Sequence, residues 1–220
     1  MYTLCWSAKG GSGTSLVAAS LAILSARQRP TLLVDLGGDQ PGLLGVPTPT
    51  GPGVGDWLGS PRATAESLRR LATEVAPQLQ LLAAGSLADG RHVDDVHAER
   101  IAHALEHGET DVVVDAGPHG RHAVLHSCAS RSLLVVRPTY LSLRRALLRP
   151  GLATGVVVLR DGRGGYSTAD VAGAVAAPVV LDAICDPAVA RAADAGLLAT
   201  RLPLTWARTV ERTLLATVRA

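Results

Sequence analysis

Residues 9 to 15, Lys-Gly-Gly-Ser-Gly-Thr-Ser, have the composition of a loop that binds phosphate. Such loops follow the pattern G-x-x-x-x-G-K-[ST], in which backbone N–H groups and a lysine hold the phosphates and a hydroxyl binds Mg²⁺. Gly13 and Ser15 fit the pattern, but Ala8 replaces the first glycine and Thr14 replaces the lysine. A different lysine, Lys9, stands at the entrance of the loop. The residues predicted to contact a nucleotide here are Lys9, Gly10, Gly11, Ser12, Gly13, Thr14 and Ser15.

The segments on either side of the loop support this interpretation. Residues 2–6 form a short apolar run typical of a buried strand, and residues 14–28 have apolar side chains at helical spacing. The glycines therefore lie where a strand turns into a helix, and a helix N-terminus presents free N–H groups and a positive dipole to an anion. The alternative is a glycine-rich turn that binds no ligand.

Strand-like and helix-like segments alternate along the whole chain. Strands are expected near 2–6, 31–35, 78–83, 111–115, 132–136, 154–159 and 178–184. Helices are expected near 14–28, 62–76, 93–107, 121–129, 140–149, 167–175, 187–194 and 204–218. This alternation predicts an α/β fold, a doubly wound, mostly parallel sheet with helices on both faces, in a single domain over 1–220. The Gly/Pro-rich stretch 37–55 is expected to be a surface loop.

Two aspartates stand at the ends of predicted strands, where a parallel sheet binds its ligands. Asp35 ends the strand Leu-Leu-Val-Asp, and Asp115 ends the strand Asp-Val-Val-Val-Asp. Mg²⁺ prefers one or two carboxylates together with phosphates and water. We therefore predict a Mg²⁺ site formed by Ser15, Asp35 and Asp115, although an aspartate in such a turn is also common without a metal.

The composition excludes several classes of protein. The formal net charge of +2 argues against an obligate polyanion binder, and the three cysteines show no metal or disulfide spacing. No uncharged apolar run is long enough to span a bilayer, and the first strand leaves no room for a signal peptide. We expect a cytoplasmic protein.

Taken together, the motifs resemble the ParA/MinD group of phosphate-loop ATPases over nearly the whole chain. That group has a deviant loop, K-G-G-x-G-K-[ST], whose entrance lysine reaches into the nucleotide site of a partner subunit. The matching segments are the loop at 9–15, Asp35 in LLVDLGGDQPGLLG, Gly53 to Leu58, Leu81 to Gly85, DVVVDAGP from Asp111, and Asp186-Pro187 with 193–196.

This resemblance implies an ATP-dependent homodimer with Mg²⁺, in which Lys9 crosses the interface and Pro187 lies near the base. The positions at which this sequence departs from the family pattern are those that serve hydrolysis and base recognition. Thr14 replaces the phosphate-gripping lysine, and Gly37 replaces a second aspartate implicated in hydrolysis, for which Asp39 could substitute if the loop bends. Leu159 replaces an asparagine that reads adenine. The branch resembling CpaE and TadZ often lacks the same lysine, so the chain is most similar to that branch.

Three functions remain open from the sequence. The favoured one is a nucleotide-binding positional or regulatory switch with weak or absent hydrolysis, whose catalytic groups would be Lys9 and Asp39. The second is a nucleotide-free pseudo-ATPase scaffold that recruits a protein partner or cargo. The third, less favoured, is an active ATPase that partitions DNA. Without the lysine that Thr14 replaces, the site lacks one preorganised cation, which would raise the activation free energy of hydrolysis by about 3 kcal/mol, or slow it about 100-fold.

Two other groups of residues carry weaker signals. All seven histidines fall between His92 and His126, and the favoured interpretation is solvated helix faces rather than a metal site or a pH switch. Basic stretches occur at 144–149 and 201–219. In the last helix, Leu204, Ala207, Val210, Leu214 and Val218 share one stripe. Packing on the core is favoured there over DNA or membrane contact.

Overall fold

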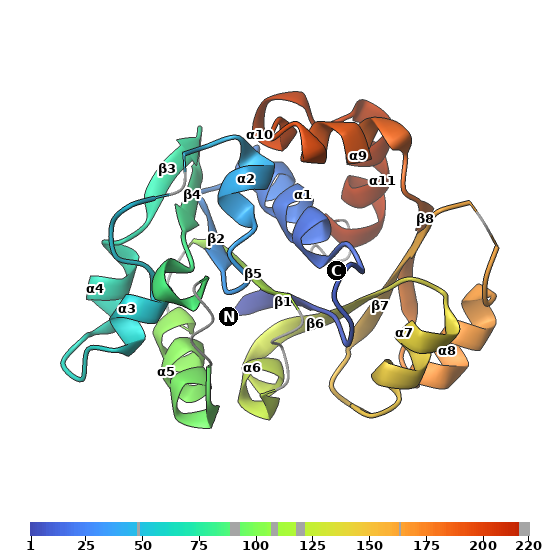
Figure 1. Ribbon diagram of the computed structural model, residues 1–220, viewed down its shortest axis with the longest axis horizontal. Helices are drawn as coiled ribbons and strands as arrows, with labels where there is room; N and C mark the ends of the chain where they lie inside the picture. Colours follow the sequence, from blue (N-terminus) through green and yellow to red (C-terminus); the bar gives the residue numbers. More distant parts are fainter. Residues whose placement is uncertain (48, 89–92, 107–109, 118–121, 163, 216–220) are drawn as a thin grey trace.

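The chain forms one eight-stranded sheet with helices on both faces, as predicted (Figure 1). The computed structural model describes residues 1–220 except 48, 89–92, 107–109, 118–121, 163 and 216–220. The strand order is β3-β4-β2-β5-β1-β6-β7-β8, and only β3 runs antiparallel to its neighbour. The strands are β1 Tyr2–Trp6, β2 Thr31–Asp35, β3 Thr73–Ala76, β4 Leu79–Leu82, β5 Asp111–Gly117, β6 Ala129–Val136, β7 Gly155–Arg160 and β8 Val179–Ile184.

The helices divide between the two faces of the sheet (Figure 1). One face carries α1 Thr14–Ala26, α2 Gln40–Leu44, α9 Pro187–Asp194, α10 Leu198–Arg201 and α11 Leu204–Val210, the last continued by a π-helical turn, η2, at Glu211–Leu215. The other face carries α3 Val54–Leu58, α4 Ala65–Arg69, a short 3₁₀ turn η1 at Gly85–Leu87, α5 Asp95–Leu105, α6 Ala123–Ser127, α7 Tyr140–Ala146 and α8 Thr168–Val175.

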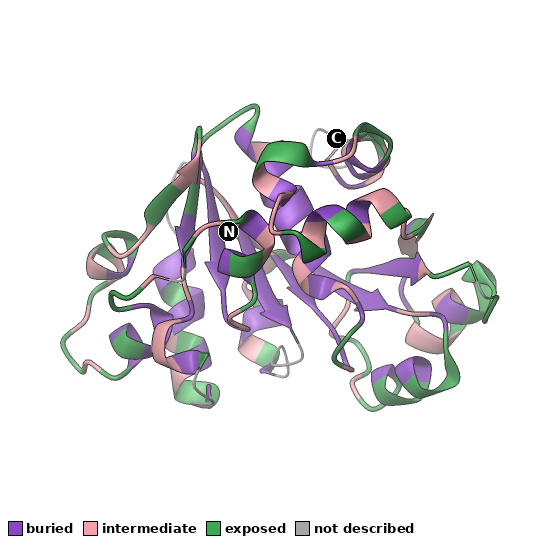
Figure 2. Ribbon diagram, turned by 45° about the horizontal axis from the view of Figure 1, so that its top comes forward, coloured by how far each residue is buried: buried purple, intermediate pink, exposed green. Residues whose placement is uncertain are grey.

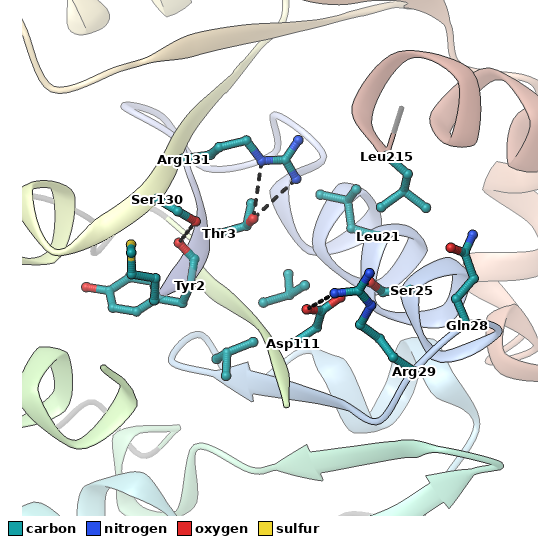
Figure 3. Close-up of a pocket in the computed structure, with 13 residues that line it drawn as sticks. Tyr2, Thr3, Leu21, Ser25, Gln28, Arg29, Asp111, Ser130, Arg131 and Leu215 are labelled. Atoms are coloured by element: carbon teal, nitrogen blue, oxygen red, sulfur yellow. Dashed lines mark hydrogen bonds and ion pairs between the residues drawn. The ribbon is translucent and has the colours of Figure 1, made fainter. Parts of the chain in front are cut away.

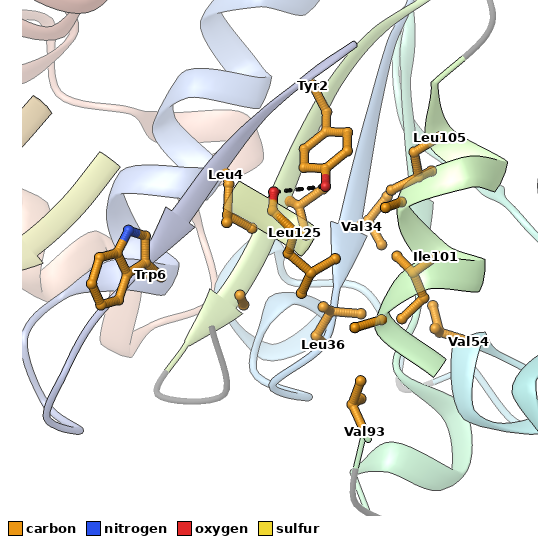
Figure 4. Packing of buried hydrophobic residues seen from close by; sticks show 14 of the residues in the cluster. Tyr2, Leu4, Trp6, Val34, Leu36, Val54, Val93, Ile101, Leu105 and Leu125 are labelled. Atoms are coloured by element: carbon orange, nitrogen blue, oxygen red, sulfur yellow. Dashed lines mark hydrogen bonds between the residues drawn. The ribbon is translucent and has the colours of Figure 1, made fainter. Parts of the chain in front are cut away.

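Two hydrophobic clusters, one on each face, hold these layers together. Strands such as β5 and β7 are apolar on both faces because both are covered by helices (Figure 2). On the face of α5 and α6, Tyr2, Leu4, Ile101 and Leu125 are almost fully buried, and the Tyr2 hydroxyl donates to the Leu125 carbonyl at 2.8 Å (Figure 4). The rigid sheet fixes the positions of the loops at its carboxyl edge.

The structure corrects three sequence predictions about elements. The expected helix over 62–76 is a short helix, α4, followed by the antiparallel strand β3. The stretch 37–55 is not only a loop, since it contains α2 and the first residues of α3, and both helices depend on tertiary contacts. In the last helix, Leu204 is exposed, and Trp206 packs inward instead; its indole N–H donates to Ser20 Oγ at 2.8 Å. Val218 lies outside the described residues.

The other members of that stripe confirm core packing of the last helix. Ala207, Val210 and Leu214 are buried in the cluster beneath α1. Within the described residues, no helix is long and apolar enough to cross a membrane.

Candidate functional site

The glycine-rich loop connects β1 to α1 at the carboxyl edge of the sheet. The backbone N–H of Ser7 donates to the Gly117 carbonyl at 2.8 Å, which ties the loop to the end of β5. Within the loop, the Ser12 hydroxyl donates to the Lys9 carbonyl at 2.8 Å. Gly13 caps α1 with a φ of 93°, and a Cβ there would lie 2.6 Å from Leu159 Cδ1. The left-handed conformation therefore favours glycine here, and a Cβ would also have to displace the end of the Leu159 side chain.

A cavity of about 660 Å³ lies over this loop. Its lining residues from the loop and α1 are Ser7, Gly10, Gly11, Ser12, Gly13, Thr14, Ser15 and Leu16. From other elements come Gly37, Asp39, Gly42, Leu43, Gly117, Ala193 and Asp194. The structure thus brings together the predicted phosphate-binding residues and Asp39. Lys9 and Pro187 are not among the lining residues.

Thr14, which occupies the lysine position, is buried at the first turn of α1. Its hydroxyl Oγ1 has no hydrogen-bond partner among the described residues. Lys9 is partly exposed, and its Nζ lies 3.4 Å from the Gly10 carbonyl. Within this subunit, the loop therefore offers N–H groups and a helix N-terminus to an anion, but no lysine inside the cavity.

Asp35 and Asp115 face each other across neighbouring strands, in register, and both are fully buried. The N–H groups of Gly37 and Gly38 donate to Asp35 Oδ1 at 2.9 and 2.7 Å, and that of Gln40 donates to Oδ2 at 3.1 Å. Burial, reinforced by the charge of Asp115, raises the pKa of Asp35 to about 7 despite these three bonds. Asp35 therefore shapes the loop that follows β2 and directs Asp39 into the cavity.

Asp115 is held by other elements rather than by its own loop alone. Gln40 Nε2 donates to Asp115 Oδ2 at 2.7 Å, the Ser15 hydroxyl also donates to this carboxylate, and the N–H of Gly117 donates to Oδ1 at 3.1 Å. Burial raises the pKa of Asp115 above its usual range. The carboxylate is thus linked directly to the loop hydroxyl predicted to bind Mg²⁺.

Gln40 is a site residue that the sequence did not reveal. Its side chain is fully buried, and Nε2 donates both to Asp115 and to the Ser15 carbonyl, at 3.0 Å. Its Oε1 is buried and has no partner among the described residues. An oxygen without a partner beside a hydroxyl and a carboxylate is a donor set that suits Mg²⁺. The residues present therefore fit this ion.

At the carboxyl end of β7, the protein's own side chains fill the space beside the loop. Leu159 is fully buried against Gly13, and the guanidinium of Arg160 binds Asp182 in a two-pronged pair at 2.6 and 2.7 Å. Asp186 accepts the N–H of Ala188 at 2.7 Å and caps α9, which begins at Pro187.

A second cavity, of about 310 Å³, lies at the opposite edge of the sheet, where the parallel strands begin (Figure 3). We call this the amino edge. Asp111 accepts a hydrogen bond from Ser25 at 2.9 Å and pairs with Arg29 at 3.5 Å. Arg131 donates to Thr3 Oγ1 at 3.2 Å and to the Leu214 carbonyl. These polar side chains therefore bind protein groups rather than standing available to a ligand.

The histidines do not form a metal site among the described residues. His122 Nδ1 lies 2.7 Å from Asp95, and His126 Nδ1 lies 2.7 Å from Ser132 Oγ. Both imidazoles are buried, so the prediction of solvated faces is wrong for these two. His92, His107 and His119 lie outside the described residues.

With this geometry in place, known proteins can be compared. No protein-family model matches the sequence, and no curated protein matches it by sequence. Solved structures do match. The MinD cell division protein of Aquifex aeolicus superposes with a TM-score of 0.77 at 19% identity, covering 100% of this chain and 98% of that chain. The fold is that of the ParA/MinD ATPases.

Two further solved structures superpose on this chain with a similar fold. A ParA family ATPase from Chlorobium tepidum gives a TM-score of 0.74 at 17% identity, with 95% of each chain covered. The septum site-determining protein MinD of Pyrococcus horikoshii, solved with Mg-ADP, gives 0.72 at 19% identity, with 100% of this chain and 98% of that chain covered. At these identities the ParA/MinD likeness establishes the fold and leaves the chemistry to the residues of the site.

Proposed function

We propose that this chain is a ParA/MinD-like protein that binds ATP with Mg²⁺ and hydrolyses it weakly or not at all. The observation that carries the proposal is the buried hydroxyl of Thr14, which has no partner among the described residues and occupies the lysine position of a loop that keeps Gly10, Gly11, Gly13 and Ser15. The N–H groups of residues 10–15 and the N-terminus of α1 would hold the phosphates. The missing cation lowers transition-state stabilisation more than binding, because phosphoryl transfer depends mainly on positioning and charge neutralisation.

Mg²⁺ would be held by the Ser15 hydroxyl and Asp115. Asp35 is a weaker candidate because its carboxylate already accepts three backbone N–H groups. When bound, the ion would neutralise charge on the phosphate oxygens. Gln40 would have to give up its bond to Asp115, and its Oε1 would then be available to the ion or to a water bound to it. Asp39, which lines the cavity, would orient a water molecule.

Two further parts of the proposal follow from the family resemblance. The partly exposed Lys9 would reach the nucleotide of a second copy, and the resulting dimer would act as a positional or regulatory switch in the cytoplasm for a protein partner or cargo. The lost lysine supports an origin near the CpaE/TadZ-type branch.

Calorimetry with ATP and Mg²⁺ tests nucleotide binding. We expect heat of binding and a rise in the unfolding temperature at millimolar ATP. Neither signal would appear if the chain is a nucleotide-free scaffold. That rival function is favoured by the hydrogen bonds that the Asp35 and Asp115 carboxylates already accept from the protein.

A turnover assay tests the role of Thr14. Thr14→Lys should raise hydrolysis by about 100-fold, because it restores one preorganised cation. Thr14→Met is the matched control, since it adds length without charge and should leave turnover low. Equal turnover in the wild type and Thr14→Lys would show that Thr14 does not limit hydrolysis.

A further inference from the structure

Helix α7 carries an exposed apolar ridge on the outside of the molecule. We define the α7 ridge as Tyr140, Leu141, Arg144, Arg145, Leu147 and Leu148, all exposed. Leu148 is 77% exposed, and the other three apolar side chains are 54–62% exposed. Among the described residues, α7 and the turn that follows it hold more large exposed apolar side chains than any other element. The ridge is therefore a concentrated feature rather than scattered surface leucines.

The opposite side of α7 explains why the helix is stable without the ridge. Leu143 and Ala146 are buried in the hydrophobic cluster, and the helix packs beside α8 (Figure 1). Helical hydrogen bonding continues past Ala146, since the N–H of Leu147 donates to the Leu143 carbonyl at 2.9 Å. The core fixes the helix, and the ridge side chains contribute little to that packing.

The charge of the ridge has one sign. Residues 139–149 contain no acidic side chain, and among the described residues neither Arg144 nor Arg145 forms an ion pair. At 100° per residue, Arg144 and Arg145 lie on either side of Leu148 on the exposed surface. The nearest helix, α8, carries Asp170, whose carboxylate is bonded to Ser167 at the start of that helix. Cationic and apolar groups therefore alternate on one exposed face.

This combination fits a lipid surface better than a protein partner. The ridge consists of a single helix about 10 Å long and the turn that follows it, whereas a stable protein interface needs about 800 Å² on each side. Leucine and tyrosine enter the boundary between headgroups and acyl chains, while arginines bind anionic headgroups. We propose that the α7 ridge is a contact surface for anionic lipid, with Leu147 and Leu148 inserted and Arg144 and Arg145 on the headgroups.

Vesicle co-sedimentation of the full chain tests this surface. The chain should sediment with vesicles of phosphatidylcholine and phosphatidylglycerol in equal parts, and much less with phosphatidylcholine alone. Leu147→Asn/Leu148→Asn should weaken binding at least tenfold, because two inserted leucines are lost. Arg144→Gln/Arg145→Gln should weaken it about 25-fold, at about fivefold for each arginine.

The last helix offers a matched control. Leu204 and Arg208 on α11 are also exposed, four residues apart. Leu204→Asn/Arg208→Gln should therefore sediment like the wild type. The unfolding temperatures of all three variants should match that of the wild type, which separates lost contact from lost folding.

Four results would overturn the proposal. The first is no sedimentation of the wild type with anionic vesicles, and the second is an equal loss in the α11 control. The third is that the leucine variant keeps full vesicle binding, while the arginine variant loses binding both to vesicles and, in a parallel assay, to DNA. This result would indicate a general polyanion surface. The fourth is a wild-type dimer in light scattering that the leucine variant converts to monomer, which would assign the ridge to a second copy.

Discussion

The two edges of the parallel sheet differ in how their buried polar groups are satisfied. At the amino edge, Asp111, Arg29, Arg131 and Thr3 form bonds with one another or with backbone carbonyls. At the carboxyl edge, two buried carboxylates lie side by side, and Thr14 Oγ1 and Gln40 Oε1 have no partner in the part of the chain that the structure describes. Groups left unsatisfied at one edge reduce stability, which is the expected cost of a site prepared for a ligand.

The largest expected effect is a pH dependence of the unfolding free energy that arises at the carboxyl edge and not at the amino edge. The pKa of Asp35 is raised to about 7, so between pH 4 and 7 the native state binds more protons than the unfolded state. Stability should therefore fall as the pH rises through this window, by about 1 kcal/mol per pH unit. Urea unfolding from pH 5 to 7.5 measures the slope. Asp35→Asn should make the slope shallower and leave the part that comes from the raised pKa of Asp115, while Asp111→Asn, at the amino edge, should leave the slope unchanged. Parallel curves for the wild type and Asp35→Asn would contradict the prediction.

Removing the amide that serves Asp115 should be the next largest effect. Gln40→Leu deprives a buried carboxylate and the Ser15 carbonyl of a donor, which should cost about 3 kcal/mol at pH 7.5. Denaturant unfolding measures the loss. The neighbouring Gly42→Ala, where a Cβ meets no atom within 4 Å, is the control and should change stability little. A cost below 0.5 kcal/mol, taken as roughly the scatter of surface substitutions, would show that the amide does not support Asp115.

A substitution at the amino edge should cost stability without touching the nucleotide site. Arg131→Met keeps the apolar stem but loses the bonds to Thr3 and Leu214, so unfolding should become easier by about 2 kcal/mol while ATP affinity is unchanged. Arg29→Met is the matched control, since that side chain is half exposed and its contact is long. A change in ATP affinity of tenfold or more in Arg131→Met would show that the two edges are coupled.

The smallest expected effect has the opposite sign. Thr14→Val removes a buried hydroxyl that no described residue bonds, and it should stabilise the protein by about 1 kcal/mol. Thr31→Val removes a buried hydroxyl that donates to the Arg29 carbonyl at 3.0 Å, so it should destabilise by about the same amount. Thermal unfolding compares the pair, and a loss of stability in both would mean that Thr14 has a partner in solution.

The sequence predicted what depends on local pattern. The loop, α1, the parallel strands and the burial of Val210 and Leu214 all follow from periodicity and from glycine placement. Gln40 had no such signal, because its burial depends on the register of β2 with β5 and on the approach of α1. The short helices α2 and α3 were missed for the same reason, since their glycines and prolines disfavour helix without tertiary contacts.

Trp6 gives the molecule a built-in optical probe. It is the last residue of β1, directly before Ser7 and the glycine-rich loop, and it is fully buried. Its indole N–H donates to Ser132 Oγ at 3.0 Å, and its ring meets that of His126 edge to face, with centroids 4.9 Å apart. An imidazole so close can quench the indole, so movement of the loop would alter its fluorescence. With Trp57 and Trp206 replaced by Phe, the emission of Trp6 alone would follow ligand binding without any attached dye.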